Sequence, residues 1–248
     1  MTRLGDGTPV HAGGRAAFDY MVALVHELQA MNGETEACVA LRAFVAVRRR
    51  YQPRYTTGNG AATVTPETLA RCITRLVAED SEHGSRAQAA VAGLFDVFAG
   101  ADRVESGRIN DPSRKYPGDI CVRSPDGGWE KAVEVRDKPV RTSDVHIFAR
   151  KCVDMGVREA AVVMVSPLQL LLDEDALASW AAGFGIGLTL FYDWPAIVDQ
   201  ALFWAPASKL DAVIAAVARI EVRLVAVEAS PRAVALWQEL VRASEASI

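Results

Sequence analysis

The chain has 248 residues, half of them hydrophobic, which is typical of a folded globular protein and excludes an intrinsically disordered one. Its formal net charge is -4, so any surface that binds nucleic acid has to be a local basic patch. The four cysteines are widely spaced, form no CxxC pair and lie outside metal-ligand spacing from the histidines, which argues against a zinc site.

Nothing in the sequence predicts export or membrane insertion. It has no N-terminal apolar leader core and no uncharged apolar run of about eighteen residues. We therefore expect a cytoplasmic protein with reduced thiols and no membrane partner.

The first third of the chain is predicted to be helical. Apolar residues recur at helical spacing from Phe18 to Leu28 and again from Leu41 to Val47, with a break at Asn32-Gly33 that predicts an αα-hairpin. A third helix is expected to start with Thr65 as its N-cap and Pro66 at its first helical position.

A fourth helix is predicted over residues 85–99, and a strand is predicted from Val104 to Asn110. The apolar side of that helix should pack on a sheet through Val91, Leu94, Phe95 and Phe98. Asp96 on this helix is either an additional acidic group of a catalytic site or, as we favour, a solvated or capping carboxylate.

The most informative stretch contains a predicted β-hairpin, 119–124 and 131–136, around the turn Pro125-Asp126-Gly127-Gly128. This turn predicts that Asp119 faces Glu134 across the hairpin, Arg123 faces Glu130 and Ser124 faces Trp129. Because side chains alternate along a strand, Arg136 and Lys138 share the face of Glu134. The opposite face should enter the core through Ile120, Val122, Val133 and Val135.

Two directly opposed carboxylates, with Cβ atoms about 5 Å apart, repel each other and favour a bound cation. Magnesium takes oxygen ligands and keeps several waters, so it suits the pair Asp119 and Glu134. A metal ion there can activate water and neutralise a phosphate under attack, which indicates phosphodiester hydrolysis.

Further elements follow the hairpin. A helix is expected from an N-cap at Thr142 or Ser143 to Gly156, with His146 on it as a surface residue or an auxiliary contact. The run 160–166 is continuously apolar and predicts a strand buried on both faces. Beyond it we expect a helix over 173–183, a strand over 186–192, and two closing helices, 207–227 and one that starts at Ser230-Pro231.

The motif residues resemble those of known nucleases. Pro117-Gly118-Asp119 followed by Glu134-Val135-Arg136-Asp137-Lys138 is similar to the PD-(D/E)xK motif. With Arg108-Ile-Asn-Asp-Pro-Ser-Arg before it, the whole run resembles the SacI family of type II restriction endonucleases. The resemblance is dense from 108 to 138 and looser from about Tyr20 to the C-terminus.

This resemblance implies a mixed α/β fold with a PD-(D/E)xK restriction-endonuclease-like core of order αβββαβ. We expect that core and the C-terminal helices in residues 85–248, after an N-terminal helical region in residues 1–84. It implies an Mg²⁺-dependent endonuclease that hydrolyses DNA, with Mn²⁺ as a possible substitute. Because palindromic targets match two-fold symmetry, a sequence-specific enzyme that cuts double-stranded DNA as a homodimer is expected.

The resemblance also implies roles for single residues. Asp119 and Glu134 are expected to bind the metal ion. Arg136 stands where most such nucleases carry Lys; because arginine stays protonated, it is expected to hold a phosphate, and Lys138 to hold the water. The expected contacts to DNA phosphates are made by Arg108, Arg114 and Lys115.

Two alternatives remain open at this point. Members of the family carry a longer N-terminal segment with no counterpart here, which suggests a nuclease subunit of a larger defence or DNA-processing complex. The Arg136 substitution and the acidic net charge suggest instead an inactive DNA-binding or interaction module on a nuclease fold.

Overall fold

The computed structural model describes residues 10–31, 33–55, 64–106 and 116–245. The chain forms two compact units, Met1–Arg54 and Tyr55–Ile248. The first unit contains a short 3-10 helix, η1 (Ala12–Gly14), and the two predicted helices, α1 (Arg15–Ala30) and α2 (Glu34–Tyr51). Neither α1 nor α2 has a buried residue, so most of their apolar side chains remain exposed, and Phe18 and Val22 are half-buried.

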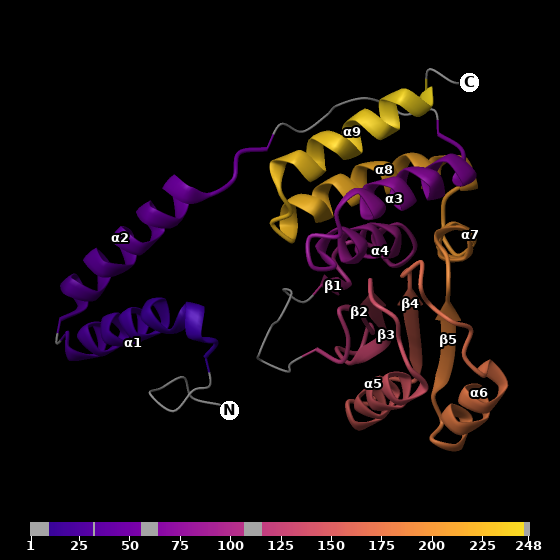
Figure 1. Cartoon of the computed structure of the whole chain (residues 1–248), viewed down its shortest axis with the longest axis horizontal. Coiled ribbons are helices and arrows are strands. Elements are labelled where there is room, and N and C mark those ends of the chain that lie inside the picture. The colour runs from indigo at the N-terminus through magenta and orange to yellow at the C-terminus, as the bar shows by residue number, and fades with distance from the viewer. Residues whose placement is uncertain (1–9, 32, 56–63, 107–115, 246–248) are drawn as a thin grey trace. The chain divides into compact units, whose positions relative to one another are not determined.

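The second unit is built on a five-stranded mixed sheet in the order β1-β2-β3-β4-β5. The first three strands are antiparallel, and β3, β4 and β5 run parallel to one another (Figure 1). Their bounds are β1 Val104–Ser106, β2 Ile120–Arg123, β3 Trp129–Arg136, β4 Glu159–Met164 and β5 Gly187–Phe191. The predicted strand to Asn110 is therefore described only as far as Ser106; the rest lies outside the described residues.

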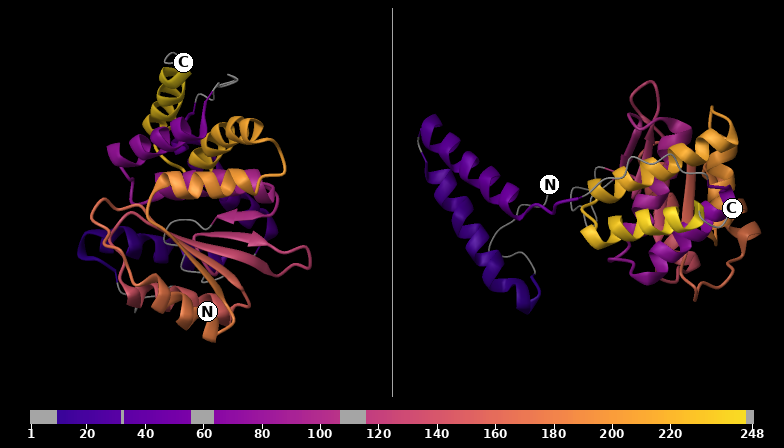
Figure 2. Two further views of the ribbon diagram at one scale, coloured as in Figure 1. Left: turned by 90° about the vertical axis from the view of Figure 1, so that its right-hand side faces the viewer. Right: turned by 90° about the horizontal axis from the view of Figure 1, so that it is seen from above.

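Helices cover both faces of the sheet (Figures 1 and 2). One face carries α5 (Thr142–Asp154) and α6 (Glu174–Gly183). The other carries the larger group, which consists of α3 (Pro66–Glu79), α4 (Ser85–Ala99), α7 (Trp194–Phe203), α8 (Lys209–Ala226) and α9 (Pro231–Glu245). The order α4-β1-β2-β3-α5-β4 agrees with the predicted αβββαβ arrangement, and the fold is mixed α/β as expected.

The alternation predicted for the hairpin separates two hydrophobic clusters. Ile120, Val122 and Val133 belong to the cluster on the α4 side, and Val135 packs against it. Cys121 and the neighbouring inward residues of β3 and β4 belong to a second cluster with α5 and α6. The sheet is therefore buried on both faces, as a parallel βαβ arrangement requires.

The helix α4 lies very close to α8. A Cβ atom at Gly93 would come within 2.6 Å of the backbone nitrogen of Ile220, so only glycine permits this helix spacing. The predicted apolar face of α4 is confirmed for Val91, Leu94 and Phe95, which are buried in the core, whereas Phe98 is partly buried and packs against it.

The predicted start of α3 is confirmed. The Thr65 side chain accepts a hydrogen bond from the backbone N–H of Thr68 at 3.2 Å, and Pro66 is the first helical residue. The helix α3 belongs to the second compact unit, where it contacts α7 and α9. The division predicted from the sequence instead places it in the N-terminal helical region, residues 1–84.

Two sequence expectations about helices need correction. The N-cap of α5 is Arg141 rather than Thr142 or Ser143. Its backbone N–H donates to the Asp144 carboxylate at 2.9 Å, which is one half of a capping box, and the Arg141 side chain makes no capping hydrogen bond. The helix α7 was not predicted at all. Its N-cap is Asp193, whose carboxylate accepts a hydrogen bond from the Ala196 N–H at 2.8 Å. The helix has only 10 residues, so its sequence pattern was not distinguished from a loop after β5.

Asp96 is neither a catalytic nor a solvated carboxylate. It is buried on α4 and forms an ion pair with Arg223 of α8, which also donates to the carbonyl oxygen of Val104 at 2.9 Å. This buried pair ties α4, α8 and the edge strand β1 together.

Arg223→Met is expected to lower the free energy of unfolding by about 3 to 5 kcal/mol, because it leaves the Asp96 carboxylate buried without its cation. Urea denaturation measures the change. Arg232→Met is the control, since Arg232 is 80% exposed in its pair with Glu79 and should contribute less than about 1 kcal/mol. Equal losses in the two variants would contradict the assignment.

Among the described residues, no single helix is long and apolar enough to cross a membrane. The bent pair of α7 and α8, at 116° to each other, meets that criterion jointly, by length and composition only.

Candidate active site

The hairpin register is confirmed next to the predicted acidic pair and differs at the turn. Ile120 pairs with Val133 and Cys121 with Ala132, as predicted, but Arg123 pairs with Trp129 instead of Glu130. The reason is a tighter loop, in which the Ser124 N–H donates to the carbonyl oxygen of Gly128 at 2.9 Å. The predicted pairing of Ser124 with Trp129 is therefore also wrong.

This irregularity leaves Glu130 as the additional residue of β3, where it forms ion pairs with Arg103 and Lys131. It is separate from the acidic pair, whose register follows the regular part of the hairpin. Asp119 directly precedes β2, and continuing the Ile120–Val133 pairing places it opposite Glu134.

Two hydrogen bonds and the close packing of Gly118 hold the Asp119 segment in place. Its carboxylate accepts a hydrogen bond from the backbone N–H of Val135 at 2.9 Å, and its carbonyl oxygen accepts one from Nε2 of Gln88 at 3.2 Å. A Cβ atom at Gly118 would lie 2.6 Å from the carbonyl oxygen of Val133. Glycine before Asp119 is therefore required for the close approach of this segment to β3.

The environment of the pair opposes its ionisation. Burial raises the pKa of Asp119, against the effects of the Val135 N–H, Arg136 and Lys151. Burial, and next the charge of Asp119, raise the pKa of Glu134 to about 7, although Arg136 and Lys151 lower it. A buried carboxyl group whose pKa is raised further by a neighbouring carboxylate is typical of functional sites and of cation sites.

This shift makes folding stability depend on pH in the metal-free protein. Folding raises the pKa of Glu134 from 4.5 to about 7, so the folded state binds this proton more tightly than the unfolded state. Stability should therefore fall as pH rises from about 4.5 to 7, and the loss should be complete above pH 7.

Glu134→Gln is expected to be more stable than wild type at pH 8 in EDTA, by up to about 3 kcal/mol, because the amide cannot ionise. At pH 4 the two proteins should differ little from this cause. Thermal denaturation at both pH values measures the difference. If Glu134→Gln gains no stability over wild type at pH 8 compared with pH 4, ionisation of Glu134 does not destabilise the folded protein, and the prediction is contradicted.

The donor set fits a hard divalent cation only in part. Asp119 and Glu134 offer carboxylate oxygens, the ligand type that magnesium and manganese prefer, and the remaining positions would be filled by water. Within the described part of the chain, no group of three or more His, Cys, Asp or Glu residues could hold a metal ion. The pair therefore suits an ion that keeps several waters rather than one enclosed by protein ligands.

The predicted cations differ in their relation to this pair. Arg136 forms an ion pair with Glu134, as expected from their shared face, and its own side chain is 53% exposed. Lys138 is exposed in the bend after β3. The structure adds Lys151 of α5, whose charge lowers the pKa of both carboxyl groups. Sequence reasoning missed Lys151 because an exposed lysine on a helix has no distinguishing pattern.

The structure describes only some of the other residues that the sequence singled out. Arg108, Arg114 and Lys115 lie outside the described residues, so their role in binding DNA stays a prediction. His146 contacts the ring of Trp180 on α6, with ring centroids 4.3 Å apart, which fits a packing role. The thiol of Cys121 is buried, which raises its pKa to about 12, so it is not a nucleophile.

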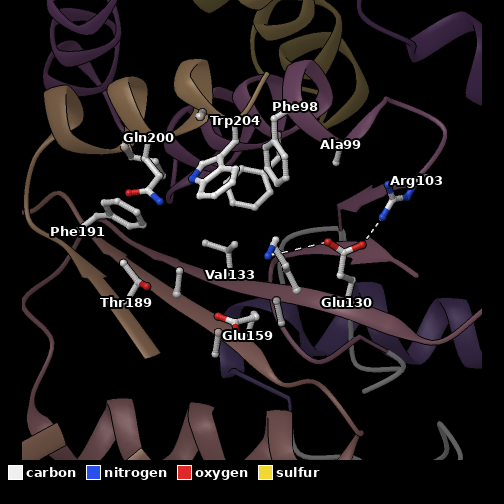
Figure 3. Close-up of a pocket in the computed structure, with 17 residues that line it drawn as sticks. Phe98, Ala99, Arg103, Glu130, Val133, Glu159, Thr189, Phe191, Gln200 and Trp204 are labelled. Atoms are coloured by element: carbon white, nitrogen blue, oxygen red, sulfur yellow. Dashed lines mark hydrogen bonds and ion pairs between the residues drawn. The ribbon is translucent and has the colours of Figure 1, made fainter. Parts of the chain in front are cut away.

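A cavity of about 570 Å³ lies on the other face of the sheet, between β3, β4 and β5 and the helices α4 and α7 (Figure 3). Val133 lines it, whereas the adjacent Glu134 does not, because side chains alternate along β3. Phe98, Trp204 and Gln200 form its helical wall. The cavity is thus separate from the acidic pair.

Comparison with known protein families shows which part of the chain resembles a known family. A family model described as the SacI restriction endonuclease C-terminal domain matches residues 62–165. This stretch runs from just before α3 to just after β4 and contains Asp119, Glu134 and Lys151. A comparison with curated proteins found no match.

Proposed function

Because this chain belongs, through residues 62–165, to the family of the SacI restriction endonuclease C-terminal domain, we propose that it is an Mg²⁺-dependent DNA endonuclease. The family suggests a nuclease that acts on DNA. Metal dependence and the residues of the site are our proposal.

The observation that carries this proposal is the pair of adjacent, mostly buried carboxyl groups within the family match. The side chain of Glu134 is only 15% exposed, and its pKa is raised to about 7 by burial and by Asp119. A fold keeps two such groups together at a cost in stability, and that cost is offset where a cation binds between them.

Each residue of the site then has a defined role. Asp119 and Glu134 hold the metal ion, which when bound supplies a Lewis acid for water activation and charge neutralisation at the phosphate. Arg136 lowers the pKa of Glu134, against burial and Asp119, and thereby favours its ionised form. Because its side chain is half exposed, Arg136 also holds an oxygen of the scissile phosphate. Arginine cannot act as a general base, so it takes no proton.

Lys151 takes the position near the reacting water that sequence reasoning gave to Lys138. Its ammonium group lowers the pKa of both carboxyl groups, so it lies within electrostatic reach of the reaction centre. Lys138, exposed in the bend after β3, contacts a neighbouring phosphate of the bound DNA strand.

The wider assignment follows the family. We propose double-stranded DNA as the substrate and a sequence-specific cut in a palindromic target, made by a homodimer whose two sites act on the two strands. Arg108, Arg114 and Lys115 bind phosphates of the substrate. Mn²⁺ is proposed to support the reaction when it is supplied in place of Mg²⁺. A cytoplasmic location is the matching expectation for such an enzyme.

One observation favours a second candidate function, an inactive DNA-binding module. Arg136 forms an ion pair with Glu134 and so provides a cation where a metal ion would otherwise be needed. Calorimetric titration with MgCl₂ and MnCl₂ separates the two functions, because an inactive module of this kind would bind neither ion.

Cleavage of phage DNA tests the proposed function. The purified protein with Mg²⁺ should produce discrete fragments, and with EDTA it should leave the DNA intact. Mapping the fragment ends gives the target sequence. Random degradation would contradict sequence specificity, and intact DNA until a second protein is added would indicate a subunit of a larger complex.

A further inference from the structure

The helix α4 begins next to the acidic pair. Its N-cap, Gly84, lies near the end of β3, since a Cβ atom there would be 3.9 Å from the carboxyl carbon of Asp137. One turn later, the side chain of Gln88 points at the Asp119 segment and donates from Nε2 to the carbonyl oxygen of Asp119 at 3.2 Å. Gln88 is only 4% exposed.

The main chain at Asp119 needs such a contact. The segment from Tyr116 to Asp119 is a series of bends, and regular pairing between β2 and β3 begins only at Ile120. The Asp119 carbonyl oxygen is therefore outside the ladder that fixes the rest of the hairpin. A partly buried carbonyl group without a partner is unfavourable, and the Gln88 amide supplies that partner.

The type of side chain also matters. An amide donates a hydrogen bond without adding a charge, whereas a carboxylate at this position would add a third negative charge beside Asp119 and Glu134. A third carboxylate there would repel both members of the pair. Glutamine holds the segment while leaving both carboxyl groups available to a cation.

We propose that Gln88 is a positioning residue for the Asp119–Glu134 pair: it fixes the main chain at Asp119 so that the Asp119 carboxylate stays opposite Glu134. The catalytic part of this inference rests on the proposed nuclease function. The structural part does not, because it concerns where the Asp119 carboxylate lies in the protein without metal or DNA.

The Val135 N–H reports that position directly. It donates to the Asp119 carboxylate at 2.9 Å, so its exchange with solvent depends on the carboxylate staying in place. Gln88→Met keeps the length and volume of the side chain and removes both amide donors. Phe95→Leu is the control: it lies on the same helix, in the hydrophobic core, and perturbs packing without touching Asp119.

Hydrogen exchange by NMR on the full chain in EDTA is the first measurement. Gln88→Met is expected to speed exchange of the Val135 amide about fivefold, the effect of losing one hydrogen bond, while Phe95→Leu leaves it unchanged relative to other β3 amides. An unchanged Val135 amide in Gln88→Met overturns the proposal, as does equal acceleration in both variants.

Metal binding and cleavage provide the second measurement. Gln88→Met should weaken Mn²⁺ binding by calorimetry about fivefold and lower kcat for DNA cleavage, with little change in KM, because the DNA-binding groups remain. Wild-type affinity and kcat in Gln88→Met would overturn the positioning role. If the wild type neither binds Mn²⁺ nor cuts DNA, the proposed function is contradicted. Faster Val135 exchange in Gln88→Met would in that case still support the structural role of Gln88.

Discussion

Glu134→Gln is expected to lower the rate of Mg²⁺-dependent DNA cleavage by about a thousandfold or more. The substitution keeps the shape of the side chain and removes the charge that binds the cation, and a bound metal ion contributes several kcal/mol to stabilising the transition state. Single-turnover kinetics on a plasmid substrate measures the loss.

Glu130→Gln is the matched control for this loss. It lies on the same strand, but its carboxylate is bound by Arg103 and Lys131 away from the acidic pair. We expect its cleavage rate to stay within about threefold of wild type. Because Glu134→Gln should also be more stable than wild type at pH 8, loss of folding cannot explain its loss of activity. Equal effects of the two substitutions would contradict the site.

Lys151→Met is expected to lower the cleavage rate about a hundredfold, whereas Lys138→Met should lower it only a few-fold. The charge of Lys151 lowers the pKa of both Asp119 and Glu134, so removing that charge should raise both pKa values further. The pair must be ionised to bind a cation, and the acid side of the pH–rate profile should therefore move to higher pH in Lys151→Met.

Measurement of kcat from pH 5 to 9 for the two lysine variants decides between them. A shifted profile in Lys151→Met alone supports the role given to α5. A larger loss in Lys138→Met, with an unshifted profile in Lys151→Met, would return the lysine role to the position that the motif spacing predicted.

Local sequence signals were sufficient for much of the fold. The Asp126-Gly127 turn and the alternation of Ile120 and Val122 predicted the hairpin, its buried face and the opposition of Asp119 and Glu134. These features depend on neighbours within about twenty residues. The element order around the site followed from the same kind of local pattern.

Features that depend on distant parts of the chain were not predictable. The partner of Asp96 is Arg223, 127 residues away, so the sequence alone suggested a solvated or catalytic carboxylate. Gln88 contacts Asp119 from a separate helix, 31 residues earlier, and Lys151 approaches the pair from α5. Nothing in their local sequence distinguishes either residue from an ordinary helical residue.

The turn shows how a small local error changes the contacts of particular side chains. The loop closes on Gly128, so Arg123 faces Trp129 and stacks its guanidinium over the Trp129 ring, 4.7 Å from the centroid. Glu130 is thereby displaced from the predicted pair and bound by Arg103. The register shift lies between Val122 and Arg123, so the pairing from Ile120 to Val122, next to the acidic pair, is unaffected.

The central claim is that Asp119 and Glu134 form the metal-dependent centre of a DNA nuclease. The most direct test is a time course of supercoiled plasmid incubated at pH 8 with excess wild-type protein or Glu134→Ala, each with Mg²⁺ or with EDTA. We predict linear DNA with defined ends from the wild type with Mg²⁺ alone, and intact plasmid in the other three reactions. Equal cleavage by Glu134→Ala, or intact plasmid in all four reactions, would contradict the claim.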